Sequence, residues 1–316
     1  MVGSLPEAIR ILSPVSSSLR PAGVYVPLVT PFDERGAVDL GALGRLAEHV
    51  LDCGARGIVA LATTGEPTSL DDREREAVVG VCSEVCLRRE AMLIVGAGTN
   101  DTRTTILRHE ALAAVAGVAA SLAVVPYYVR PSEAAIVRHF QAVAARSPVP
   151  LIAYNIPYRT GRGLGADALL ELAATANIAG VKQAVGCVDA DTLRVMAEAG
   201  DDFALLGGDD AFLFPLMLMG ARGAIAASAN LCTRRFVEMI ECGLREEVEA
   251  GRGHAKALLP LVQALFAEPS PAVIKALLHA QGRIPAAAVR MPLADASPEA
   301  TARALEACRR VEQFAS

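Results

Sequence analysis

The chain alternates short apolar runs with longer stretches that have helical periodicity. The apolar runs occupy residues 24–29, 57–62, 92–95, 121–125, 150–154, 178–182, 203–206 and 223–227. They are nearly continuous in hydrophobicity, which is typical of parallel strands covered on both faces. The stretches between them predict helices that begin near Asp39, Asp71, Thr102, Ser132, Gly165, Asp189, Ala211 and Asn230. Several of these starts carry Asp, Ser or Thr, the residues that cap helix N-termini.

Eight successive strand–helix units predict an α/β protein with a (β/α)8 TIM barrel. The alternative is a doubly wound sheet, which usually has a glycine-rich turn after its first strand. Here the first apolar run ends in Val29-Thr30-Pro31-Phe32 instead. Gly96-Ala97-Gly98 follows a predicted strand, but an isolated GxG is weak evidence. The pattern therefore favours the barrel.

The chain continues well beyond the eighth predicted strand. Further helices are predicted near 230–248, 252–266, 271–281 and 297–313. Only the first is needed to complete a barrel, so the others predict a C-terminal helical appendage. We therefore expect a catalytic barrel over 23–248 and a helical region over 249–316. Residues 1–22 are rich in Pro and Ser, lack the apolar core of a secretory signal, and are interpreted as an N-terminal extension.

Composition narrows the functional classes. The sequence is 53% hydrophobic and 21% charged, with a net charge of −5, so nothing favours nucleic acid or an anionic membrane as a partner. No apolar run reaches the roughly 18 residues that a membrane span requires. The five histidines form no HxH or HExxH pair, so no catalytic zinc site is predicted. Seven scattered cysteines indicate reduced thiols of a cytoplasmic protein, with Cys82 and Cys86 on the inner face of a helix rather than in a redox pair.

Polar residues follow several predicted strands, and a barrel places its chemistry at those carboxyl ends. These residues are Thr63-Thr64-Gly65-Glu66, Tyr127-Tyr128, Tyr154-Asn155, Arg159-Thr160-Gly161, Lys182-Gln183 and Gly207-Gly208-Asp209-Asp210. They come from different parts of the chain, and we expect them to converge on one mouth of the barrel.

Lys182 is the most informative of these residues. The chain has 30 basic residues but only three lysines, Lys182, Lys256 and Lys275, so arginine is its usual cation. Burial lowers the pKa of a lysine and gives the neutral amine that attacks a carbonyl, a role that arginine cannot perform. Alternatively, the side chain extends out of the strand end to pair with a carboxylate. Its apolar strand and its polar neighbours favour a Schiff-base lysine.

The other candidates have plausible structural roles as well as chemical ones. Thr63 and Thr64 form a hydroxyl-rich turn that could hold a small carboxylate. Tyr154 could relay protons, or it could be a core tyrosine with a hydrogen-bonded hydroxyl. Arg159 could grip a second carboxylate bidentately, or it could be a solvated surface residue. Asp209 and Asp210 look like an acid/base pair, but their position favours capping of the helix predicted near Ala211.

The motifs taken together resemble the dihydrodipicolinate synthase / N-acetylneuraminate lyase family of pyruvate-dependent class I aldolases. The resemblance extends from about residue 23 to 310 and is carried by Val29-Thr30-Pro31-Phe32, Thr63-Thr64-Gly65-Glu66, Pro126-Tyr127-Tyr128, Tyr154-Asn155-Ile156-Pro157, Gly180-Val181-Lys182 and Gly207-Gly208-Asp209-Asp210. It implies a Schiff-base enzyme that needs neither a metal nor an organic cofactor.

The resemblance also implies residue roles. Lys182 matches the lysine that forms the imine with pyruvate, and Tyr154 matches the tyrosine that relays protons together with Thr63. Thr63, Thr64 and the adjoining Gly65 match the turn that holds the pyruvate carboxylate. Tyr128 matches a tyrosine that reaches the neighbouring subunit's site across a tight dimer, so we expect a homo-oligomer, a dimer of dimers. Ile225 matches a residue whose backbone carbonyl faces the site.

Arg159 indicates the synthase branch of the family, in which this arginine binds the carboxylate of L-aspartate 4-semialdehyde. The resemblance therefore implies condensation of pyruvate with this aldehyde to give 4-hydroxy-tetrahydrodipicolinate, a step of lysine and diaminopimelate biosynthesis. One alternative is an aldolase or lyase that cleaves a 2-keto-3-deoxy sugar acid. Another is a catalytically inactive binding paralogue, against which the retention of Lys182, Tyr154 and Thr63 argues.

Lysine is expected to inhibit the protein weakly or not at all. Of the positions that match the lysine-feedback site of bacterial synthases, Asn100 fits the pattern, but Pro67, Asp72, Arg75 and Thr104 do not. A titration of the activity with lysine tests this expectation. Strong inhibition at modest lysine concentrations would contradict it.

Overall fold

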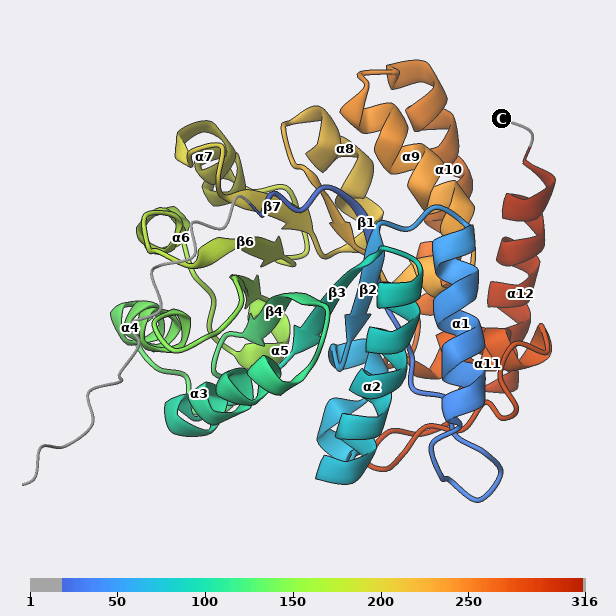
Figure 1. Cartoon of the computed structure of the whole chain (residues 1–316). Coiled ribbons are helices and arrows are strands. Elements are labelled where there is room, and N and C mark those ends of the chain that lie inside the picture. The colour runs from blue at the N-terminus through green and yellow to red at the C-terminus, as the bar shows by residue number, and fades with distance from the viewer. Residues whose placement is uncertain (1–18, 315–316) are drawn as a thin grey trace, which may run out of the picture.

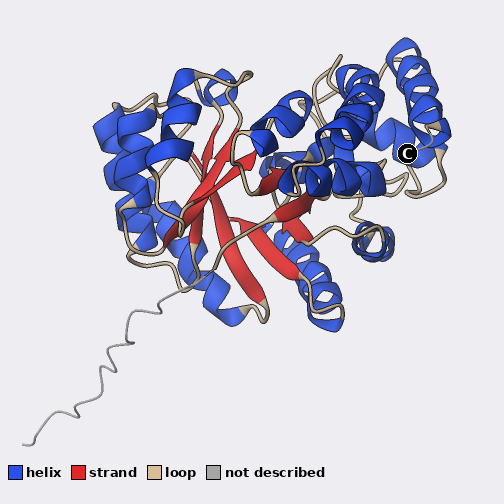
Figure 2. Ribbon diagram, turned by 90° about the horizontal axis from the view of Figure 1, so that it is seen from above, coloured by secondary structure: helices blue, strands red, loops and turns tan. Residues whose placement is uncertain are grey.

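The computed structural model describes residues 19–314, in which eight parallel strands close into a barrel in the order β1 to β8. Helices surround the strands (Figures 1 and 2). The strands are β1 Gly23–Pro27, β2 Gly57–Ala60, β3 Met92–Gly96, β4 Val118–Val124, β5 Leu151–Asn155, β6 Ile178–Gln183, β7 Ala204–Gly207 and β8 Gly223–Ile225. The predicted TIM barrel is confirmed, and each strand overlaps one predicted apolar run.

The strand ends differ from the prediction where the backbone turns early. β2 stops at Ala60 because Leu61 adopts a left-handed φ of 54° and a short 3-10 helix, η1 (Thr63–Gly65), follows. β8 ends at Ile225, before another 3-10 helix, η5 (Ala227–Asn230). β4 begins earlier than predicted, at Val118, beside a register irregularity at Leu93/Ile94 of β3. The turns η1 and η5, which follow β2 and β8, bring polar groups to the barrel mouth.

The covering helices begin mostly where the capping residues predict. They are α1 Leu40–Asp52, α2 Asp72–Arg88, α3 Thr102–Ala111, α4 Glu133–Ala144, α6 Ala166–Ala173, α7 Ala190–Glu198, α8 Leu213–Leu218 and α9 Thr233–Leu244. The side chains of Asp39, Asp71, Asp101, Ser132 and Asp189 each accept a hydrogen bond from the backbone N–H three residues later. Local capping chemistry therefore sets five of these helix starts.

Two helices begin two to three residues after their predicted starts. After β7 the chain forms a 3-10 helix, η4 (Asp210–Phe212), before α8 begins at Leu213, and after β8 η5 precedes α9, which begins at Thr233. The prediction that Asp209 and Asp210 cap the first of these helices is wrong. Asp209 accepts from the Gly186 N–H at 2.6 Å, and Asp210 accepts from the Ser228 N–H at 2.7 Å. Each carboxylate thus accepts from a donor in a neighbouring loop, which a local pattern does not reveal, while the second oxygen of Asp210, Oδ1, is buried without a hydrogen-bond partner.

The core has an inner and an outer part. Side chains inside the barrel form one cluster, which includes Tyr25, Val59, Ile94, Leu122, Ile152, Tyr154, Leu206 and Ile225. A larger cluster fills the space between the strands and the helices. Cys82 and Cys86 are buried in this larger cluster on α2, as predicted, and burial raises the pKa of Cys86 to about 12.

Within residues 19–314, no helix combines the length and the apolar character needed to cross a bilayer.

The C-terminal helices lie together on one side of the barrel (Figures 1 and 2). They are α10 Val248–Leu265, α11 Ala272–Ala280 and α12 Pro298–Gln313. Most of the N-terminal extension predicted over 1–22 lies outside the described residues. Of its described part, Leu19 packs on the inner cluster and Arg20 forms an exposed ion pair with Asp202 at 2.7 Å.

Candidate active site

Lys182 and Tyr154 form the centre of the site. They are register partners on the adjacent strands β6 and β5, and both side chains are buried. The Lys182 Nζ lies 4.2 Å from the centre of the Tyr154 ring. Room for the lysine depends on Gly208, where an added Cβ would lie 2.9 Å from the Lys182 Cε. The glycine after β7 therefore leaves space for the lysine side chain.

Burial is the main determinant of the protonation of Lys182, and it lowers the pKa of this amine to about 8. The carboxylates of Asp210 and Asp209 oppose the effect, while Arg159 reinforces it. An amine with this pKa is substantially neutral at mildly alkaline pH and can act as a nucleophile. Burial also raises the pKa of Tyr154, although Arg159 and a hydrogen bond with Thr63 act in the opposite direction. Tyr154 therefore keeps its proton and can donate it.

The turn at Thr63–Gly65 presents polar groups beside this pair. Its backbone is closed by hydrogen bonds from the Gly65 N–H to the Ala62 carbonyl at 2.8 Å and from the Glu66 N–H to the Thr63 carbonyl at 3.1 Å. Thr30 donates to the Gly65 carbonyl at 2.7 Å. Thr64 is buried, whereas Thr63 opens onto a cavity. The prediction of a hydroxyl-rich turn here agrees with this geometry.

A cavity of about 660 Å³ connects the mouth residues, with Thr63, Tyr154, Tyr127 and Arg159 in its lining. Arg159 belongs to the short helix α5 (Pro157–Thr160), which begins directly after β5. Its guanidinium lies 5.5 Å from the centre of the exposed Tyr158 ring. Arg159 is therefore a cavity residue, and not only a solvated surface cation.

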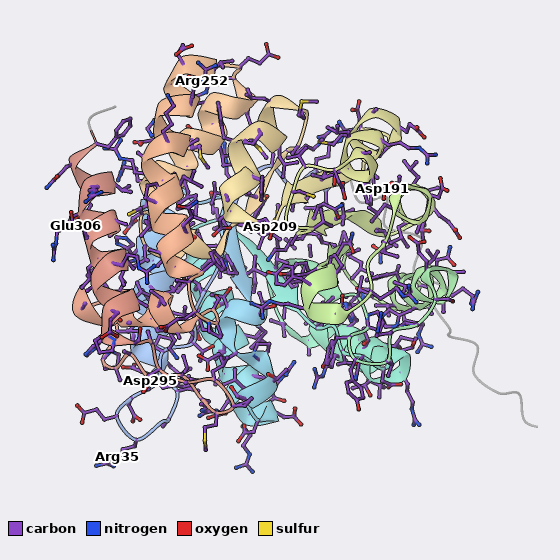
Figure 3. All side chains as sticks on the ribbon, turned by 180° about the vertical axis from the view of Figure 1, so that it is seen from behind. Arg35, Asp191, Asp209, Arg252, Asp295 and Glu306 are labelled. Carbon is purple, nitrogen blue, oxygen red and sulfur yellow. The ribbon has the colours of Figure 1, made fainter. Side chains whose placement is uncertain are left out.

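A second cavity, of about 560 Å³, lies on the other side of Arg159. Its lining includes Arg159, Gly208, Asp209 and residues of the C-terminal region such as Phe266 and Ser270. Asp209 lies near the middle of the molecule, whereas Asp191, Arg252 and Glu306 lie at its periphery (Figure 3). Arg159 lines both cavities, so a ligand in either space can reach its guanidinium.

The remaining predicted site residues separate into two groups. Ile225 is buried inside the barrel, in the same cluster as Tyr154. Tyr128 is 87% exposed and has a left-handed φ of 70°, so the structure does not bring it to the chain's own Lys182. Its neighbour Tyr127 lines the cavity in its place.

A buried amide network behind the site was not predicted. The Asn155 amide donates to the Leu164 carbonyl and to Gln183 Oε1, each at 3.0 Å, and Gln183 donates to Thr192 at 2.9 Å. Asn155 thereby holds the chain after α5, which carries Arg159, against the end of β6. The available signal was a pair of large polar residues closing two apolar strands, since buried amides need partners.

Two arginines lie at the outer end of the larger cavity. Arg75 and Arg108 line it together with Asn100 and Thr104. Arg75 donates to the Pro67 carbonyl at 2.8 Å, and its pKa is lowered by burial and by the charge of Arg108. Two guanidiniums at this point disfavour the binding of a further cationic ligand.

The residues described by the structure contain no cluster of three or more His, Cys, Asp or Glu side chains arranged to hold a metal ion. The functional groups at the mouth are the Lys182 amine, the Tyr154 phenol, threonine hydroxyls, the Arg159 guanidinium and the carboxylates of Asp209 and Asp210.

Comparison with known proteins identifies the family. The model of the dihydrodipicolinate synthetase family matches residues 20–309. The chain belongs to this family. Within the dihydrodipicolinate synthetase family, one relative is a 4-hydroxy-tetrahydrodipicolinate synthase of Moorella thermoacetica, 38% identical over 277 residues that cover 87% of this chain and 93% of the relative.

Solved structures of other family members superpose closely. The 4-hydroxy-tetrahydrodipicolinate synthase of Methylacidiphilum fumariolicum SolV is 32% identical, with a TM-score of 0.88 over 93% of this chain and 97% of its own. The chloride-inhibited dihydrodipicolinate synthase of Acinetobacter baumannii, complexed with pyruvate, is 31% identical, with a TM-score of 0.88 over 92% and 99%. The resemblance inferred from the motifs is thus confirmed.

Proposed function

We propose that this chain condenses pyruvate with L-aspartate 4-semialdehyde to give 4-hydroxy-tetrahydrodipicolinate, as a Schiff-base lyase of the class I aldolase type. The observation that carries the proposal is Lys182: a buried amine whose pKa is lowered to about 8, with its Nζ 4.2 Å from the centre of the Tyr154 ring at the barrel mouth. The relatives that carry the synthase name support the choice of reaction.

In the proposed reaction, residues of the chain carry out the chemical steps in the following order. The neutral Lys182 amine attacks C2 of pyruvate, and the resulting carbinolamine loses water to form an imine. Tyr154, hydrogen-bonded with Thr63, delivers the proton that leaves with this water. Thr63, Thr64 and Gly65 hold the pyruvate carboxylate. Tyr154, deprotonated when the carbinolamine loses water, takes a proton from the methyl group and so converts the imine to an enamine, whose carbon attacks the aldehyde carbon of the semialdehyde. Tyr154 then returns the proton to the alkoxide that forms. The amine of the bound semialdehyde adds to C2, displaces the Lys182 amine and closes the ring of the product.

A paired assay tests the proposal against cleavage of a 2-keto-3-deoxy sugar acid. The enzyme is mixed with pyruvate and aspartate semialdehyde, and product formation is followed. In a parallel assay, release of pyruvate from 2-keto-3-deoxy sugar acids is measured. Activity in the first assay alone supports the proposal. Pyruvate release without condensation would assign the chain to the lyases, and inactivity in both assays would favour a binding paralogue.

Replacing Arg159 by leucine is expected to reduce kcat/KM for aspartate semialdehyde by roughly 100-fold, because charge-assisted hydrogen bonds to a carboxylate are lost. The half-saturating pyruvate concentration for imine formation should change little. Steady-state kinetics with each substrate varied in turn measures both effects. Arg162→Leu is the matched control, because Arg162 is a nearby exposed arginine. An equal loss with aldehydes that lack a carboxylate would contradict this role.

We propose a homo-oligomer, a dimer of dimers, in which Tyr128 completes the site of the partner subunit. The exposure of Tyr128 in the single chain supports this assignment. Lys182→Ala and Tyr128→Phe are each expected to be impaired alone, but activity should rise when the two variants are co-expressed. A hybrid dimer then contains one site with an intact Lys182 and an intact Tyr128. No gain over the sum of the separate variants would contradict a shared site.

We further propose a cytoplasmic location and a division into a catalytic barrel at 23–248 and a helical region at 249–316. All seven cysteines are free thiols, which supports a reducing compartment. The break between α9 and α10 at residues 245–247 supports the boundary. Cell fractionation tests the location, and limited proteolysis tests whether cleavage occurs near residue 248.

A further inference from the structure

A second buried lysine makes an ion pair outside the chemistry described above. Lys275, on α11, donates to Glu66 Oε1 at 2.9 Å, and the two side chains are 0% and 2% exposed. The residues are 209 positions apart in the sequence. Of the other lysines, Lys182 lies at the barrel mouth and Lys256 is exposed on α10. Lys275 is therefore a buried cation that the proposed reaction does not use.

The other oxygen of Glu66 is also held by the C-terminal region. The Arg290 backbone N–H donates to Glu66 Oε2 at 2.8 Å. The Arg290 guanidinium donates to the carbonyls of Ser69 and Gly36, each at 2.8 Å. Asp295, from the same segment as Arg290, and Arg35, next to Gly36, lie on the same side of the molecule (Figure 3). The chain after α11 thus reaches back to the loop after β2 and to the loop before α1.

Phe32 packs against both cations of this cluster. The Lys275 Nζ lies 3.9 Å from the centre of the Phe32 ring, and the Arg290 guanidinium carbon lies 4.4 Å from it. Both cations therefore pack against an aromatic ring that is itself 1% exposed. The Lys275 ammonium and the Glu66 carboxylate meet where water is excluded. Their attraction is stronger there than in water, and it holds the two groups in one orientation.

Glu66 is joined directly to the turn that holds the pyruvate carboxylate in the proposed function. It has a left-handed φ of 53°, a conformation that non-glycine residues rarely adopt. Its N–H donates to the Thr63 carbonyl at 3.1 Å, and its own carbonyl accepts from the Ser69 N–H at 3.0 Å. The conformation of Glu66 therefore sets the direction in which the chain leaves Thr63, Thr64 and Gly65.

A buried ion pair adds little net stability, since desolvation of the two charges offsets their attraction. Such a pair does define a geometry, because both groups must keep their partner to remain buried. The Glu66–Lys275 pair joins a strained residue of the substrate turn to a helix of the C-terminal appendage. It thus fixes the turn rather than the barrel.

We propose that Lys275 is a positioning residue: acting through Glu66, it holds the Thr63–Gly65 turn in the geometry that receives the pyruvate carboxylate. The inference rests on the proposed function. It assigns the C-terminal appendage an indirect part in pyruvate recognition, because Lys275 does not touch the substrate.

The test uses the full-length variants Lys275→Met and Glu66→Gln, the double variant, and Lys256→Met as a matched control. Imine formation is followed by borohydride trapping across a range of pyruvate concentrations. The half-saturating pyruvate concentration should rise roughly tenfold in each single variant, as expected for the loss of one hydrogen bond to a charged group. The double variant should be no worse than Glu66→Gln alone, because Lys275 acts only through Glu66.

Two further readouts separate positioning from general stability. The KM for the aldehyde should stay within about twofold of the wild-type value, and Lys182 should still be trapped fully at saturating pyruvate. If Lys275→Met does not fold, Glu66→Gln, which keeps the size and an acceptor oxygen of Glu66, carries the same test. Wild-type trapping with an unchanged pyruvate dependence in the folded variants would overturn the proposal. Absence of trapping in the wild type would instead overturn the proposed function.

Discussion

Replacement of Lys182 by arginine is expected to abolish borohydride trapping with pyruvate and to reduce turnover by roughly 10⁴-fold or more, as for loss of a catalytic nucleophile. Arginine keeps the positive charge but has no accessible neutral amine at working pH. Lys182 is buried beside Tyr154, so no solvent-exposed amine can take its place. Mass spectrometry after reduction measures the adduct, and a coupled assay measures turnover.

The wild-type pH profile provides an independent check on the same group. Only the neutral amine attacks pyruvate, so kcat/KM for pyruvate should rise with pH and level off above about pH 8, the pKa that burial gives Lys182.

For the Lys182→Arg substitution, Lys256→Arg serves as the control, because it replaces an exposed lysine in the same way. An adduct mapped to Lys275 or Lys256 would contradict the assignment, as would retained trapping in Lys182→Arg.

The second large effect is expected from Tyr154→Phe, which should reduce kcat by roughly 10² to 10³-fold, within the range for general acid–base catalysis. The substitution removes one hydroxyl and keeps the ring against Lys182. Rapid-mixing measurements should show slow imine formation. Pyruvate affinity should change less than the rate, because in the proposed function the Thr63–Gly65 turn, and not Tyr154, holds the carboxylate.

Tyr25→Phe is the matched control for this change. Tyr25 is also buried inside the barrel, but its hydroxyl accepts a hydrogen bond from the Ala22 N–H at 3.2 Å, near the start of β1. This hydroxyl lies at the amino end of β1, whereas the site lies at the carboxyl ends of the strands. Loss of the Tyr25 hydroxyl should therefore leave imine formation nearly unchanged. Equal impairment of the two variants would show that the hydroxyl of Tyr154 has no special role.

The barrel could be predicted because its signals are local. Each strand is a short apolar run, and Asp39, Asp71, Ser132 and Asp189 mark helix starts by their own capping bonds. The prediction was less accurate after β7 and β8, where the chain forms η4 and η5 and the helices begin two to three residues later than predicted. There the carboxylate of Asp210 accepts from the Ser228 N–H, a contact between two loops that neither segment reveals alone.

The candidate site shows the same division between local and distant information. Lys182 and Tyr154 were found because parallel strands place their carboxyl ends together, so strand order alone predicts proximity. The amide network of Asn155 and Gln183 carried a weak signal, two polar residues in apolar strands. For the Glu66–Lys275 pair the only signal was the rarity of lysine in this chain, because the geometry of the pair depends on how the appendage folds back onto the barrel.

That return of the chain has a consequence for the order in which the protein is made. Arg290 and Glu66, whose contact fixes one carboxylate oxygen, are 224 residues apart. During translation, β1 to β8 are synthesised before α11 and the segment beyond it, and segments that are made early begin to fold first. The nascent barrel can close while Glu66 still lacks both of its partners. A chain that terminates early would therefore retain the barrel and Lys182 but lack the contacts that hold Glu66. If these contacts order the pyruvate pocket as proposed, catalytic competence arrives only with the last part of translation.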